Sequence, residues 1–325
     1  MTNKEIIHPI EPGFSLTPEA TPLSVAPDEI GREKSPIEKE SFPIPKLEIE
    51  LPKLKNRKNV DGVDSYLEQL KSGGVLEQMA GMVVFGSAVR CDISPRSDLD
   101  TLIVVKDLPN VVANKTEKEI DKIQRNRSPF PTAKSKTEQL IEWLMPRIGF
   151  YPHLRSTIQR TDFSEGKYQV LKTGDVLTKR LFPTKLTFVS IISDSIVLGK
   201  LEVPRLEMSK KSLITELIKS ASVYYSLSLS ALILSNLSSW GDIGSYEFSK
   251  LSLKNCFFAL RSRNGTFEEI EKEFKHVLPD QFWEEFIKEQ NSNWEEAGKS
   301  RLVFLAPKAI IRIHQYTISA ILSSR

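Results

Sequence analysis

The sequence predicts an α+β fold, in which a small mixed β-sheet packed with helices precedes an all-α helical bundle. Two short apolar runs rich in β-branched residues, at 82–85 and 101–105, are bounded by turn-forming residues, as strands are. Beyond Pro204, apolar residues recur at helical spacing, beginning with a long segment at 208–237. A stretch of strand patterns followed by a stretch of helix patterns is typical of α+β proteins or of two separate domains.

Three regions follow along the chain. Residues 1–58 hold nine of the nineteen prolines and little apolar periodicity, so we expect a disordered Pro-rich leader. Residues 59–203 are expected to form the sheet domain, with a polar, helix-like insertion at about 106–133. The helical domain is then expected over 204–325.

Each element of the sheet domain has its own signal. Val63, Leu67 and Leu70 lie at helical spacing, and Gly73–Gly74 ends that pattern. The remaining elements are predicted, in order, as a strand at 82–85, a strand carrying Asp100, a polar helix at 116–126, a helix at 135–145, a strand at 153–159, an apolar segment at 186–193 and a helix-to-strand ending at 193–200.

The last part of the chain reads as a series of helices, predicted at 208–237, 246–262, 266–277, 280–296 and 299–323. Thr266 with Glu269 three residues later predicts a capping box at the start of one of them. Gly265, just before Thr266, is a natural end for the preceding helix.

One apolar stretch needs a membrane check. Residues 220–241 carry no charge over 22 positions, which is long enough to span a bilayer, but they include eight serines. A buried core helix is therefore the preferred interpretation, and a membrane-tethered regulator is the alternative.

Net charge, cysteine spacing and the first residues indicate the compartment in which the protein is expected. The net charge of +3 is too small to argue by itself for nucleic-acid binding. The two cysteines, Cys91 and Cys256, are far apart and follow no metal-binding spacing, which favours a reducing compartment without disulfides. The first residues lack the charged-then-apolar pattern of a signal peptide. We therefore expect a cytoplasmic protein.

The most informative segment joins a small-residue turn to a pair of acids. Gly86 and Ser87 end one predicted strand, and Asp98 and Asp100 follow after a spacer of ten residues, entering the next strand. A Gly-Ser turn lets backbone N–H groups approach a phosphate closely. Carboxylates at i and i+2 of a strand point to one face, where both can hold one Mg²⁺ together with substrate phosphates. The segment therefore predicts a site for a metal–nucleoside triphosphate.

This arrangement resembles the signature of the DNA polymerase β-like nucleotidyltransferase superfamily. Gly86–Ser87, the ten-residue spacer and Asp98–Leu99–Asp100 are most similar to the small prokaryotic and kanamycin nucleotidyltransferase-like members. Cys91 stands where those proteins usually have glycine, which is a mild departure. Residues 254–278 also resemble the C-terminal helical bundle of the kanamycin type.

The resemblance implies a role for each motif residue. Gly86 and Ser87 would contact the terminal phosphates of the nucleotide, and Arg90 would neutralise charge on the leaving pyrophosphate. Asp98 and Asp100 would hold Mg²⁺ or Mn²⁺ and act as the catalytic carboxylates. For Arg90, a plain surface arginine in a turn remains the alternative.

The family usually supplies a third carboxylate from the next central strand, but residues 150–161 contain no Asp or Glu. His153 lies in that region and has a pKa range suited to a base, although a structural role is the simpler interpretation. Asp162, Glu165 and Asp175 lie nearby in the sequence, and Asp162 is the best candidate among them.

Two functions remain open. In the first, the protein is a nucleotidyltransferase that uses a nucleoside triphosphate, ATP by preference, and an acceptor that is a small molecule, a protein or an RNA. In the second, motivated by the missing third carboxylate, the fold is inactive and binds a nucleotide or a protein partner. No membrane is expected in either case.

Overall fold

The computed structural model describes most of the chain from the first helix onward. The described residues are 57–90, 100–127, 136, 139, 157–167, 182–204, 206–236, 240–292 and 300–323. The predicted leader, the predicted helix at 135–145 and most of the strand predicted at 153–159 lie outside them.

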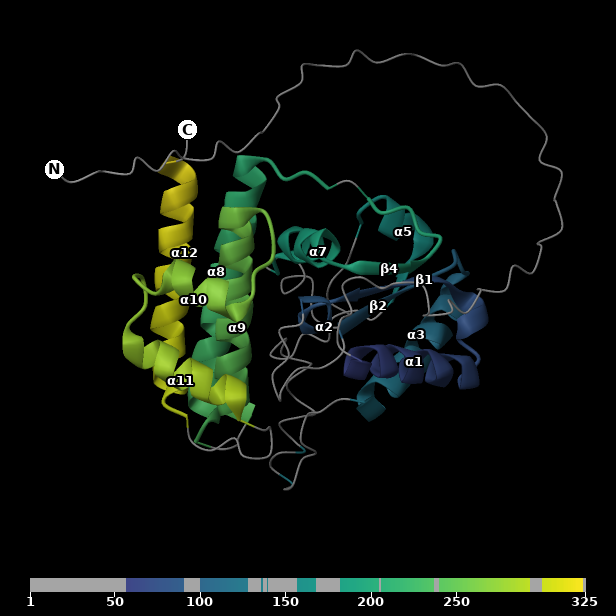
Figure 1. Cartoon of the computed structure of the whole chain (residues 1–325), viewed down its shortest axis with the longest axis horizontal. Coiled ribbons are helices and arrows are strands. Elements are labelled where there is room, and N and C mark those ends of the chain that lie inside the picture. The colour runs from purple at the N-terminus through teal and green to yellow at the C-terminus, as the bar shows by residue number, and fades with distance from the viewer. Residues whose placement is uncertain are drawn as a thin grey trace, which may run out of the picture. The chain divides into compact units, whose positions relative to one another are not determined.

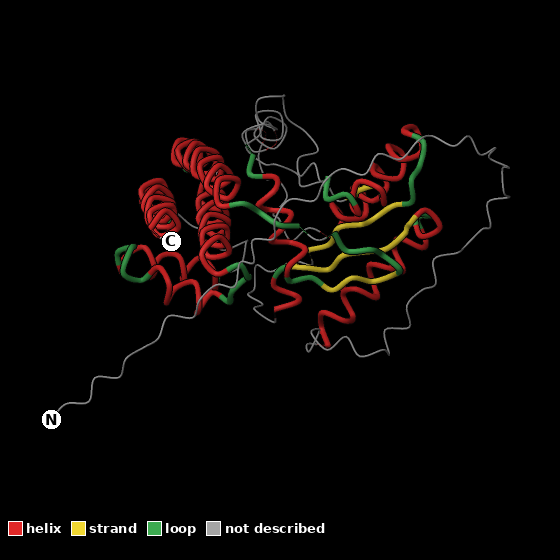
Figure 2. The backbone as a smooth tube through the Cα atoms, turned by 90° about the horizontal axis from the view of Figure 1, so that it is seen from above, coloured by secondary structure: helices red, strands yellow, loops and turns green. Residues whose placement is uncertain are grey.

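The sheet has four strands in the order β3-β2-β1-β4. Central β1 pairs antiparallel with both β2 and β4, and β2 pairs parallel with β3, so the sheet is mixed as predicted. Figure 2 shows the strands, in yellow, running alongside one another. Their bounds are β1 Met79–Phe85, β2 Asp100–Val105, β3 Thr157–Gln159 and β4 Ile196–Gly199.

Helices cover both faces of this sheet (Figure 1). The helices of the region are α1 Arg57–Ser72, the 3-10 turn η1 Leu76–Gln78, α2 Ser87–Arg90, α3 Asn110–Arg127, α5 Arg160–Ser164 and α7 Thr184–Ser193. Successive side chains of β1 point to opposite faces of the sheet and therefore contact different helices. Met82 and Val84 pack in one cluster with residues of α1 and α3, whereas Val83 packs in another with residues of α5 and α7.

Helix α3 shows why the polar segment at 106–133 belongs to the packing of the sheet. Ile120 is fully buried and joins Tyr66 and Leu70 of α1 in one cluster. The helix is polar on its other faces, as expected of an amphipathic helix with one apolar stripe. The predicted helix at 116–126 is thus confirmed, and it begins six residues earlier than its periodicity indicates.

All secondary-structure elements in the described part of the C-terminal region are helices. Its helices are α8 Lys210–Leu234, α9 Trp240–Arg261, α10 Phe267–Phe274, α11 Asp280–Asn291 and α12 Leu302–Ser323. The three long ones, α8, α9 and α12, pack on one another (Figure 1). The predicted capping box is present, because the Thr266 hydroxyl accepts from the Glu269 N–H while the Glu269 carboxylate accepts from the Thr266 N–H.

A buried carboxylate joins α7 to α8. Glu216 of α8 is 5% exposed, and its Oε2 accepts hydrogen bonds from the backbone N–H groups of Lys185 and Leu186 at 2.9 and 3.2 Å. These N–H groups lie in the first turn of α7, which has no side-chain cap of its own. Lys219 lies 2.7 Å from Oε1 of Glu216 and balances its charge.

Helix α8 is long and apolar enough, by length and composition alone, to cross a membrane. One face of it packs against α9 and α12, where Tyr224, Leu227 and Ala231 are buried. Its other face exposes Ile218 and Ile233. The expectation of a core helix therefore holds for one face of α8 and not for the whole circumference.

Candidate nucleotide-binding site

The predicted site begins where β1 ends. Gly86 directly follows β1 with a φ of +79°, a backbone conformation that residues with a side chain rarely adopt. A β-carbon on Gly86 would lie 2.1 Å from Oδ2 of Asp100. Glycine is therefore required at this turn both by the backbone angle and by the carboxylate that lies against it.

Asp100 reaches this turn because of strand register. It is the first residue of β2, and its Cα pairs with that of Phe85 at the end of β1. The structure thus brings together the turn and the second acid of the predicted pair, although they are far apart in the motif. Asp98 lies outside the described residues, so its predicted place beside Asp100 stays a prediction.

The short helix α2 carries the next two predicted residues. Ser87, its first residue, is 8% exposed, and Arg90, its last, donates its backbone N–H to the Gly86 carbonyl at 3.3 Å. The turn therefore places both side chains close to Gly86 in the structure as well as in the sequence.

Arg90 is not a surface residue. Its side chain is 10% exposed, and its Nη1 lies 3.7 Å from Oδ2 of Asp194. Its Nε and Nη2 atoms are buried and have no hydrogen-bond partner among the described residues. Burying charged donors without partners is costly, and an anion bound at this place would satisfy them. The geometry favours an anion-binding role over that of a plain surface arginine.

The structure adds a residue that sequence reasoning missed. Lys254 of α9 lies within electrostatic reach of Arg90 and Asp100, although it is more than 150 residues away from both in the chain. Burial is the main cause that lowers the pKa of Lys254 to about 8, with the positive charge of Arg90 acting in the same direction and Asp100 in the opposite direction. Its ammonium group also lies 5.2 Å from the centre of the Phe267 ring.

Two further charged residues of α9, Lys250 and Glu247, act electrostatically on Lys254. Lys250, one turn earlier, lowers the pKa of Lys254, and Glu247 raises it. Lys250 and Glu247 pair with each other at 2.5 Å. The spacing of lysines 250 and 254 on a mostly apolar helix was the available signal, but no motif of the sheet region points to α9.

The candidates for a third carboxylate lie beyond the end of β3. Strand β3 runs parallel to β2, and its last residue, Gln159, pairs with Val105 at the far end of β2 from Asp100. Asp162 follows in α5, where the neighbouring Thr161 N–H donates to Asp107 at 2.9 Å. Asp162, the best candidate for a third carboxylate, and Glu165 therefore follow β3 at the end of β2 that lies away from Asp100. His153 and Asp175 lie outside the described residues.

Of the two predicted metal ligands, Asp100 is among the described residues and Asp98 is not. Within it, no group of three or more His, Cys, Asp or Glu side chains converges as a metal cage would require. Mg²⁺ does not need such a cage, because it is usually held by one or two carboxylates together with phosphates and water. The Asp100 carboxylate has the hard oxygen atoms that Mg²⁺ prefers, and Asp98 remains the predicted second ligand.

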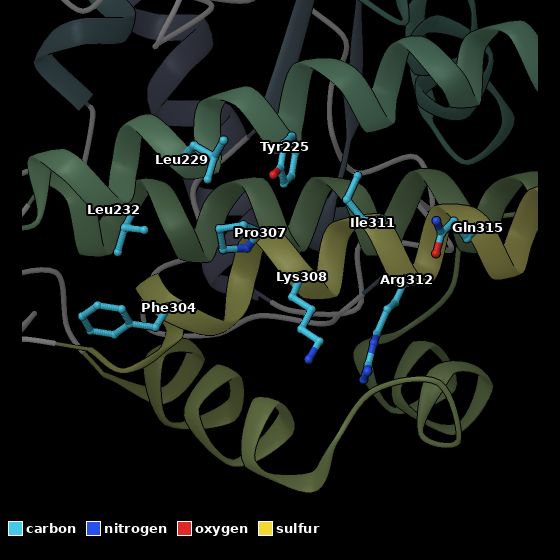
Figure 3. A pocket seen from close by; sticks show the side chains of 9 residues that line it. All are labelled: Tyr225, Leu229, Leu232, Phe304, Pro307, Lys308, Ile311, Arg312 and Gln315. Atoms are coloured by element: carbon cyan, nitrogen blue, oxygen red, sulfur yellow. The ribbon is translucent and has the colours of Figure 1, made fainter.

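An open groove lies elsewhere, on the outer side of α8 and α12 (Figure 3). Its volume is about 510 Å³, and it is lined mainly by apolar side chains, with Lys308 and Arg312 as its cations. It contains none of the predicted site residues and no carboxylate. The groove is therefore separate from the site built on Gly86 and Asp100.

Comparison with known proteins finds a matching family model and similar solved structures. Residues 65–159 match the model of a protein family described as "Nucleotidyltransferase domain", and this stretch contains the whole predicted motif. One similar solved structure is that of spectinomycin adenyltransferase AAD(9) from Enterococcus faecialis with ATP and spectinomycin. It has 12% sequence identity and a TM-score of 0.44, and the match covers 82% of this chain and 99% of that chain. No curated protein matches the sequence. Residues 65–159 therefore match a nucleotidyltransferase domain, in agreement with the resemblance that the Gly-Ser and Asp-x-Asp motifs carry.

Proposed function

We propose that the protein moves a nucleoside monophosphate from a nucleoside triphosphate, ATP by preference, to an acceptor hydroxyl. An acceptor oxygen would bond to the α-phosphorus while the bond to the bridging oxygen breaks, and the electron pair would leave with pyrophosphate. The acceptor proton would be lost to a base or to water. The acceptor is a small molecule, a protein or an RNA.

The observation that carries this proposal is the pairing of a carboxylate with unpaired cationic donors at one turn. Asp100 lies against Gly86, and the buried Arg90, four residues after Gly86, has two donors without a partner among the described residues. Lys254 adds a second positive charge close to both. A triphosphate with a divalent cation has the charges that this arrangement lacks.

The residues present fit a divalent cation by their donor chemistry. Asp100, with Asp98 as the predicted second ligand, would hold Mg²⁺ or Mn²⁺, which when bound would neutralise charge on the phosphate oxygens. The chain's own cations would act on the leaving group: Arg90 and Lys254 would stabilise the negative charge that grows on pyrophosphate.

A second candidate is an inactive nucleotide-binding protein. It is favoured by the absence of any Asp or Glu from 150 to 161, together with the position of Asp162 at the end of β2 that lies away from Asp100. This protein would bind a triphosphate and release it unchanged.

The experiment that separates the two candidates uses the full chain with α-³²P-labelled ATP, GTP, CTP and UTP, Mg²⁺ or Mn²⁺, and a cell lysate as the source of acceptors. The control is the Asp98→Asn/Asp100→Asn variant, checked for folding by circular dichroism. Transfer of label by the wild type and its loss in the variant would support the transferase. Binding of triphosphate without transfer of label would support the inactive protein. Absence of both binding and transfer would overturn both candidates.

A further inference from the structure

We propose that Asp194 is a positioning residue that holds the Arg90 guanidinium so that its free edge receives a phosphate of the substrate, and that Asn264 of the helical region fixes Asp194 in turn. This inference rests on the proposed function, because it assigns a role to residues behind the same anion site.

The first step is the shape of the guanidinium group. Asp194 engages Nη1, and the atoms left without a partner among the described residues are Nε and Nη2. Nε and Nη2 form one edge of the planar fork, and such an edge binds two oxygens of one phosphate or carboxylate. The carboxylate of Asp194 therefore lies at one corner of Arg90, and the buried edge formed by Nε and Nη2 is the part of the group whose hydrogen bonds an anion would complete.

The second step is the placement of Asp194 in the fold. It follows α7 and precedes β4, whose first residue, Ile196, pairs with Val84 near the end of β1. Asp100 lies on the other side of the same strand end, because it pairs with Phe85 on β2. The two carboxylates thus flank the end of β1 from opposite sides. Asp100 lies against Gly86, and Asp194 pairs with Arg90.

The third step is electrostatic. Lys254 and Arg90 repel each other, and the positive charge of Lys250 also repels Lys254. Without a carboxylate behind it, Arg90 would be driven away from Lys254 whenever no anion is bound. Asp194 offsets this repulsion at 3.7 Å, with a side chain that is 25% exposed, so Arg90 stays in place before the substrate arrives.

The fourth step links Asp194 to the helical region. Asn264, in the connection between α9 and α10, donates to the Ser190 carbonyl at 2.7 Å and to the Ser193 hydroxyl at 3.4 Å. Its Oδ1 also accepts from the Ser190 hydroxyl at 2.7 Å. These bonds hold the last turn of α7, directly before Asp194. Lys254 lies in α9, and Asn264, which follows α9, holds the turn of α7 directly before Asp194.

The test measures binding of ATP with Mg²⁺, and of pyrophosphate with Mg²⁺, to the full chain by titration calorimetry. The variants are Asp194→Asn, Arg90→Met and the double variant, with Asp194→Glu as the charge-retaining rescue. If Asp194 acts through Arg90, Asp194→Asn should weaken ATP binding about tenfold in the wild-type background and have no further effect when Arg90 is already Met. Asp194→Glu should recover part of the affinity. Asn264→Ala should cause a smaller loss than Asp194→Asn.

The matched control is Glu273→Gln, which removes the carboxylate of another arginine pair, Arg261–Glu273. It should leave ATP binding unchanged, and thermal melting of every variant checks the fold. A merely structural Asp194 would lower the melting temperature and weaken binding equally in both Arg90 backgrounds, which would overturn the inference alone. If the wild type binds neither ATP nor pyrophosphate, the proposed function fails, and this inference fails with it.

Discussion

The Cα atom of Gly86 lies directly against the carboxylate of Asp100, so closely that a β-carbon on Gly86 would come within 2.1 Å of Oδ2. These two residues are 14 positions apart in the sequence, and the pairing of Phe85 with Asp100 brings them together. The contact explains why a glycine precedes Ser87: its absent side chain is the space that the carboxylate occupies.

The first prediction concerns this contact. Gly86→Ala should displace the Asp100 carboxylate and weaken binding of ATP with Mg²⁺ at least tenfold, besides straining the backbone by about 1–2 kcal/mol. Gly74→Ala is the matched control, because Gly74 also has a positive φ, of +67°, but nothing lies within 4 Å of its β-carbon position. The two variants should show similar losses in melting temperature from the backbone, and only Gly86→Ala should lose affinity. Equal affinities in the two variants would contradict the proposed role of the contact.

The second prediction concerns Lys254. Lys254→Met keeps much of the apolar length of the side chain and removes the charge near Arg90 and Asp100. Transfer of label from ATP should fall about 100-fold, because a preorganised cation at the leaving group is lost. Lys308→Met, which removes a cation from the groove on α8 and α12, is the control and should keep full activity. A Lys254→Met protein as active as the control would show that α9 takes no part in the site.

The third prediction concerns the buried carboxylate that caps α7. Glu216→Ala should lower the free energy of unfolding by about 2–4 kcal/mol, because two backbone N–H groups and Lys219 lose their partner. Glu216→Gln keeps an acceptor and should lose less. Chemical denaturation at pH 7 measures both values. An Ala variant as stable as the wild type would mean that water replaces the cap without cost.

The fourth prediction concerns pH. His314 of α12 is 1% exposed, and its ring nitrogens lie 2.7 Å from the Ile310 carbonyl and 3.0 Å from the Ser220 hydroxyl. Burial lowers the pKa of His314 to about 4. In the unfolded chain the His314 imidazole takes up a proton near pH 6.5, whereas in the folded chain it stays neutral down to about pH 4. Above about pH 6.5 the ring is neutral in both states, and His314 does not reduce the stability of the fold. Stability is then lost as the pH falls toward 4, by at most about 3 kcal/mol from this residue.

Denaturation at several pH values between 4 and 7 measures this dependence. His314→Gln removes the titrating group and keeps hydrogen-bonding atoms for Ser220, so its stability should change less over the same pH range. An identical pH dependence in the two proteins would assign the effect to other groups.

The predictions from sequence held where the signal is local. The apolar, β-branched runs at 82–85 and 101–105 predicted the two central strands, and the split of Met82 and Val83 between opposite faces follows from the alternation of side chains along a strand. The Thr266–Glu269 capping box was also predicted, because its hydrogen bonds join residues three apart. The boundaries moved where packing extends an element: β1 begins at Met79, three residues before the predicted strand, and α9 begins at Trp240 rather than at 246.

The sequence by itself determined the α+β class, the helical C-terminal region and the Gly-Ser turn that follows the first central strand, since each depends on short-range periodicity or on a compact motif. Tertiary structure alone decided which distant residues join that turn. Strand register brought Asp100 to Gly86 and placed Asp162 beyond the other end of β2, and helix packing added Lys254 of α9 and Asp194 beside Arg90. The physical reason is that register and packing are set by long-range burial, which leaves no fixed spacing in the sequence from which such partners can be predicted.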